Sequence, residues 1–112
     1  MEVVNNNVES KGNILEYLKS INVNSSNIHE EFELDNYIAS VVMITTSSTT
    51  LNGSDEEYVV YSLFQDKKDN KIYGKYFNQE FNNKDEAKKY YTDLKSKVRT
   101  LTNNDILNLI YL

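Results

Sequence analysis

The runs YIASVVMITT (residues 37–46) and YVVYSLFQ (58–65), with Asn52-Gly53 between them, decide the fold. The first run is mostly apolar and β-branched, which predicts a strand covered on both faces or nearly so. The second run predicts the next strand, and Asn-Gly between two such runs is typical of a tight hairpin. Residues 45–50 keep strand propensity but lack an apolar side, so we expect them to project beyond the sheet.

Further strands are predicted on both sides of this hairpin. Residues 22–27 are rich in Asn and Ser and indicate a turn. Residues 32–34, in which Phe and Leu alternate with acids, indicate a short edge strand. Asp69-Asn70 indicates a second tight hairpin, after which residues 71–81 return as a strand.

Helical spacing occurs near both ends of the chain. Residues 11–21 carry one apolar stripe: Ile14, Leu15, Tyr17, Leu18 and Ile21. A longer stripe runs from Ala87 to Leu101 behind Asn83, which is a typical helix N-cap with Glu86 three residues on. Residues from Thr102 onward favour a short final helix, and a closing strand stays open as an alternative.

These elements predict a single α+β domain spanning residues 1–112, with residues 1–9 frayed. Its expected architecture is a two-layer sandwich, in which an antiparallel sheet of three or four strands is packed by two helices. The expected order is α-β-β-β-α, because an antiparallel meander needs its apolar face covered and two amphipathic segments are available.

The composition excludes several kinds of site. Without cysteine there is no disulfide, thiolate metal site or cysteine nucleophile, and three glycines form no phosphate-binding loop. The one histidine, His29, lacks the partner imidazoles of a zinc site, and we interpret it as a solvated loop residue. No nucleophile elbow surrounds any serine. The chain is therefore expected to be no enzyme and to bind no cofactor or metal.

Three residues of the second predicted hairpin need a separate explanation. Asp66, Asp69 and Asn70 have oxygens that suit calcium, but their spacing is not that of a calcium-binding loop. We interpret them as turn residues.

Nine tyrosines must supply much of the core. Strand alternation predicts that Tyr58 and Tyr61 point to opposite faces, and likewise Tyr73 and Tyr76. One ring of each pair is then expected to be a candidate for exposure.

Charge is divided unevenly along the chain. Residues 1–60 hold ten acids and two bases, whereas residues 61–112 hold seven acids and ten bases. The acids form two candidate partner-binding clusters, Glu30, Glu31, Glu33 and Asp35, and then Asp55, Glu56 and Glu57. Such clusters either keep the protein soluble or bind a basic groove of another protein.

The basic half contains a family-like segment. The stretch Asn83-Lys84-Asp85-Glu86-Ala87-Lys88-Lys89 follows a predicted hairpin and resembles the entry into the last helix of a double-stranded-RNA-binding domain. The resemblance implies that Lys84 and Lys88 contact phosphate. Asp85 and Glu86 depart from the family's basic segment, and the glycines that precede the family's helix are absent.

Our first interpretation is a small acidic binding protein that inhibits a nucleic-acid-handling enzyme stoichiometrically, of the anti-CRISPR or anti-restriction type made by phages. It would occlude a basic surface, aided by exposed tyrosines, and would itself bind neither nucleic acid nor membrane. The lack of a secretory pattern at residues 1–7 predicts a cytoplasmic protein, in the host cell if phage-encoded. The alternatives are an immunity protein or antitoxin against a basic toxin, an RNA-binding module using the basic hairpin and helix, and a self-associating structural protein. The oligomeric state is left open.

Overall fold

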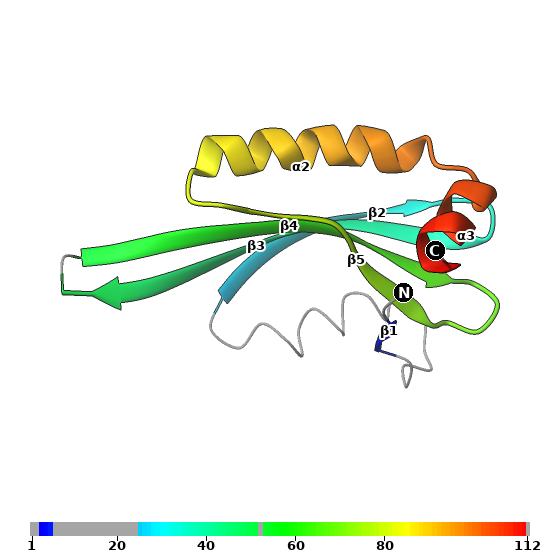
Figure 1. The fold of residues 1–112 in the computed structure, drawn as a ribbon, viewed down its shortest axis with the longest axis horizontal. Helices are drawn as coiled ribbons and strands as arrows, with labels where there is room; N and C mark the ends of the chain where they lie inside the picture. The colour runs from blue at the N-terminus through cyan, green and yellow to red at the C-terminus, as the bar shows by residue number, and fades with distance from the viewer. Residues whose placement is uncertain (1–2, 6–24, 52, 112) are drawn as a thin grey trace.

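A computed structural model describes residues 3–5, 25–51 and 53–111 of the chain. An antiparallel sheet with two helices packed on it forms an α+β arrangement, as predicted (Figure 1). Its long strands are β2 (Ser25–Glu33), β3 (Tyr37–Thr50), β4 (Gly53–Asp66) and β5 (Ile72–Phe81). The three-residue β1 (Val3–Asn5) lies in the segment expected to fray and pairs with β5, so the sheet order is β1-β5-β4-β3-β2.

The helices are α2 (Lys84–Arg99) and α3 (Asn103–Tyr111), and both follow the strands. From β2 onward the order is therefore β-β-β-β-α-α. The predicted helix over 11–21 lies outside the described residues. The final element, for which a strand was the alternative, is helical.

The central hairpin is the longest regular feature of the sheet. β3 and β4 pair without a bulge from Tyr37 opposite Asp66 to Thr50 opposite Gly53. Gly53 has a φ of +124°, a conformation that a side chain disfavours, which explains the glycine at the turn. The expectation of a hairpin between these two strands is confirmed.

The hairpin extends past its neighbours at residues 47–50, whereas residues 45 and 46, also expected to project, still pair with β2. Pairing with β2 ends at Thr46, and pairing with β5 ends at Tyr58. Beyond these points, within the described part of the chain, β3 pairs only with β4. We call residues 47–57 the arm; it projects from the sheet at the left of Figure 1.

The edge strand β2 is longer than expected. Residues 25–27, predicted to belong to a turn, pair with β3, and His29, predicted in a loop, lies in β2 opposite Val42. Both predictions were wrong because a long, continuous β3 edge offers backbone partners, and such pairing outweighs the local turn preference of Asn and Ser.

The central strands are buried on both faces. On the face that carries the helices, Tyr37, Ala39, Val41 and Met43 of β3 pack with buried residues of α2 and α3. On the opposite face, Val42 clusters with Tyr61, Leu63 and Ile72. The prediction of a doubly covered strand is confirmed.

The tyrosine predictions were half right. Tyr58 and Tyr61 do belong to opposite faces, but both are buried. Tyr73 and Tyr76 pack against the same cluster, contrary to expectation. The reason is that β5 uses three residues where β4 uses two, and each such bulge reverses the alternation of side chains.

Local capping explains where the helices begin. The Asn83 side-chain oxygen accepts a hydrogen bond from the Glu86 backbone N–H at 3.0 Å, as predicted for an N-cap. Before α3, the Thr102 backbone N–H donates a hydrogen bond to the Asp105 carboxylate at 2.9 Å. The Asp105 backbone N–H in turn donates to the Thr102 hydroxyl oxygen at 3.2 Å. These bonds satisfy N–H groups that a helix start leaves without partners.

We expect Asn83→Ala to lower the free energy of unfolding by about 1 kcal/mol, because it removes the cap of α2. Urea unfolding followed by circular dichroism measures this. Asn82→Ala is the matched control, one residue earlier and outside the cap, and should change stability by less than half as much. Equal effects of the two substitutions would contradict the assignment of the cap.

Candidate functional site

Three acids sit together on the arm, on the β4 strand. Asp55, Glu56 and Glu57 are exposed and lie opposite Ser48, Ser47 and Thr46 of β3, none of which is basic. Among the described residues these three carboxylates make no ion pair. The arm therefore carries three negative charges that the rest of the described chain leaves without a counter-charge.

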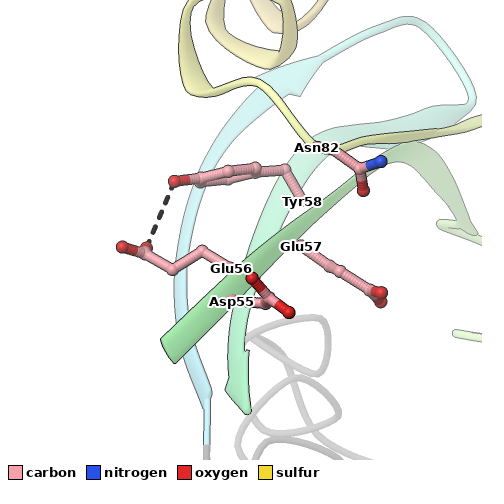
Figure 2. Close-up of a pocket in the computed structure, with 5 residues that line it drawn as sticks. All are labelled: Asp55, Glu56, Glu57, Tyr58 and Asn82. Carbon is pink, nitrogen blue, oxygen red and sulfur yellow. Dashed lines mark hydrogen bonds between the residues drawn. The ribbon is translucent and has the colours of Figure 1, made fainter. Parts of the chain in front are cut away.

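The three acids border a hollow where β5 leaves the sheet. Its volume is about 550 Å³, and its lining consists of Asp55, Glu56, Glu57, Tyr58 and Asn82. In Figure 2, Glu56 and Tyr58 extend to one side of β4, while Asp55 and Glu57 extend to the other. Strand alternation produces this arrangement, so the negative charge is presented on both faces of the arm.

Tyr58 connects the acids to the core. Its ring is buried against the helix face, and its hydroxyl donates a hydrogen bond of 3.2 Å to the Glu56 carboxylate. Burial raises the pKa of Tyr58, and the hydrogen bond and charge of Glu56 raise it further. The hydroxyl therefore stays protonated near neutral pH and orients Glu56.

The second acidic cluster, at residues 30–35, is partly neutralised by lysines. Glu30 pairs with Lys95 of α2 at 2.8 Å, and Glu33 pairs with Lys67 at 2.9 Å. The hydrogen bond and charge of Lys95 lower the pKa of Glu30 below its ordinary value, despite an opposing contribution from desolvation. Lysines thus balance two of the four formal charges of this cluster within the fold.

The two acidic clusters do not form one continuous face. Glu57 is level with Thr46 of β3, whereas Glu33 is level with Ile38, near the other end of that strand. Eight residues of β3 separate these positions, a distance of about 27 Å at the usual strand rise. Asp35 lies beyond β2, beside the start of α3.

The basic residues are also divided. Lys67, Lys68 and Lys71 lie at the β4–β5 turn, before β5, whereas Lys84 and Lys88 lie in α2, which begins after β5 ends. Three further bases of α2 stand over aromatic rings within 5 Å of the ring centres: Lys95 over Tyr91, Lys97 over Phe77 and Arg99 over Phe32. Within the described residues, the lysines of the β4–β5 turn and those at the start of α2 do not form one basic patch.

Other candidate sites have structural roles. Asp66 and Asp69 each accept a hydrogen bond from the backbone N–H two residues on, at 2.8 and 3.0 Å, which confirms their interpretation as turn residues. His29 Nε2 lies 3.8 Å from a Glu31 oxygen. No three His, Cys, Asp or Glu side chains of the described residues are grouped as metal ligands would be.

Comparison with known proteins adds no relative. No family model, no curated protein and no solved structure matches this chain. None of the helices described here has the length and apolar character that crossing a bilayer requires.

Sequence reasoning identified the three arm acids but missed the other residues of the hollow, Tyr58 and Asn82. The available signal was the Asn82-Asn83 pair, since a helix cap directly after a strand ends the pairing there. That ending leaves the neighbouring acids of β4 at an edge that no described strand covers.

We expect Lys95→Met to raise the pKa of Glu30 toward its ordinary value, because the substitution removes the dominant hydrogen bond and the nearest positive charge. Since the folded pKa is lowered, the pair stabilises the fold above the ordinary pKa of glutamate, and this stabilisation is lost as pH falls through the lowered value. Carboxyl-carbon NMR titration measures the shift. Lys84→Met, at the other end of α2, is the control and should leave the Glu30 titration unchanged.

Proposed function

We propose that the protein is a small acidic binding protein without chemistry of its own, which inhibits a nucleic-acid-handling enzyme by occupying its basic surface. The observation that supports this most is the group of carboxylates at Asp55, Glu56 and Glu57 on a projecting arm, for which the described residues provide no counter-charge. A row of carboxylates imitates the phosphates of nucleic acid, and long-range attraction accelerates its association with a basic groove.

Of the two acidic clusters predicted to bind a partner, the one on the arm has the better support. The acids at 30–35 are engaged by lysines at two positions, and releasing them for a target breaks those pairs. The arm acids have no such competitor among the described residues. We therefore assign target binding to the arm and a subsidiary contribution to Glu31 and Asp35.

The same physics serves an immunity protein or antitoxin that covers a basic toxin, and the two functions differ only in the identity of the target. We also propose that the protein acts in the cytoplasm. Recognition of duplex RNA has less support, because the turn lysines and the helix lysines lie at opposite ends of β5, and Asp85 and Glu86 occupy the first turn of α2.

We expect the triple charge reversal Asp55→Lys, Glu56→Lys and Glu57→Lys to abolish capture of basic nucleic-acid-binding proteins from a nuclease-treated bacterial lysate. The wild type should retain such proteins, identified by mass spectrometry, in a manner weakened by salt and by added duplex DNA. The matched control is the reversal of Glu30, Glu31 and Glu33, which should reduce retention less. Equal retention by the wild type and the arm variant contradicts the proposal.

A further inference from the structure

On its β4 side, the arm has a backbone edge that no described strand covers, and we call it the open edge. β5 ends at Phe81, which is opposite Tyr58, and the chain then leaves through Asn82 toward α2. β4 itself continues past Tyr58 toward the turn at Gly53. Over residues 54–57, no strand of the described chain lies beside this edge.

Hydrogen bonds at the far end of the hairpin establish which backbone groups face that edge. The Lys67 N–H donates to the Asn36 carbonyl at 3.1 Å, so odd-numbered residues of β4 bond to β3. The Asp66 N–H donates to the Lys71 carbonyl at 2.9 Å, so even-numbered residues face β5. Because the β3–β4 register is unbroken, Ser54 and Glu56 turn their N–H and C=O groups to the open edge.

We propose that this edge takes up an extended basic segment of the target as an additional β-strand. The inference rests on the proposed function and specifies how the target is held. Main-chain hydrogen bonds to Ser54 and Glu56 provide the pairing, and the acids select the segment by charge. The hollow beside the edge, lined by the acids with Tyr58 and Asn82, gives room for long basic side chains.

The arrangement of the acids specifies the pattern of the bound segment. Asp55, Glu56 and Glu57 are consecutive, so they alternate between the two faces of the arm. A strand that meets all three must carry bases on both of its own faces. The matching segment therefore contains consecutive lysines or arginines, and alternating bases would leave one face of the arm unpaired.

The same charges argue against a second copy of the chain at this edge. Pairing β4 with β4 of another molecule would set acids beside acids, which destabilises a sheet. A basic partner converts that repulsion into attraction. The occupant that charge complementarity favours is thus a foreign basic strand.

Two blocked, fluorescein-labelled peptides of equal composition test the proposal by fluorescence anisotropy. Thr-Val-Arg-Lys-Arg-Val-Thr has consecutive bases, and Arg-Val-Lys-Thr-Arg-Val-Thr has bases on one face only. We expect the first to bind more tightly. Ser54→Pro removes an N–H group from the open edge. It should weaken binding of the first peptide by about tenfold, the size of one or two lost hydrogen bonds. The control is Thr49→Pro, which lies opposite Ser54 on the other edge of the arm and should leave binding of the first peptide unchanged.

N-methylation of the peptide backbone keeps the test independent of how Ser54→Pro folds. Of two methylation patterns, one at positions 2, 4 and 6 and one at positions 3 and 5, only one should abolish binding, because an added strand uses a single edge.

Equal affinity for both peptides, with neither methylation pattern having an effect, overturns strand addition. If charge reversal of the arm acids still abolishes binding in that case, the proposed function stands. If charge reversal of the arm acids removes neither peptide binding nor target capture, both strand addition and the proposed function are overturned. Dimerisation of the wild type that Ser54→Pro abolishes, seen by sedimentation velocity, assigns the edge to a second copy and also overturns the proposal.

Discussion

The unbroken pairing of β3 with β4 is the constraint on which the rest of the structure depends. These strands supply both faces of the sheet, so the helix-side cluster and the opposite cluster are both built on them. β2 and β5 are shorter and pair along parts of this hairpin. What remains of the hairpin beyond them becomes the arm, so the candidate site follows directly from a difference in strand lengths.

Charge is redistributed when the chain folds. Along the sequence, acids gather in the first half and bases in the second. In the folded molecule, β2 lies within reach of α2 and the β4–β5 turn, and lysines from both neutralise Glu30 and Glu33. Bases of α2 also stack on aromatic rings. Among the described residues, the arm acids have no such compensation, because the arm extends away from α2 and the β4–β5 turn (Figure 1).

The central hairpin and α2 could be predicted from sequence because their signals are local: a β-branched run, Asn-Gly, and Asn83 before a helical stripe. Other features depend on distant partners. The strand at residues 25–27 forms because the β3 edge is available, and the faces of Tyr73 and Tyr76 depend on bulges in β5. Likewise, the sequence identified both acidic clusters, but the lysines that neutralise one of them are more than thirty residues away along the chain. Only the register showed how far apart the two clusters are.

The side chains that the structure describes on the arm are exposed, and this has an evolutionary consequence. Exposed positions outside a packed core tolerate substitution with changes in stability of roughly 0.5 kcal/mol or less. Residues 55–57 can therefore vary while the buried hairpin, helix caps and aromatic contacts keep the domain folded. Under the proposed function, changes at this one segment would alter recognition of the target and leave the folding of the domain almost unaffected.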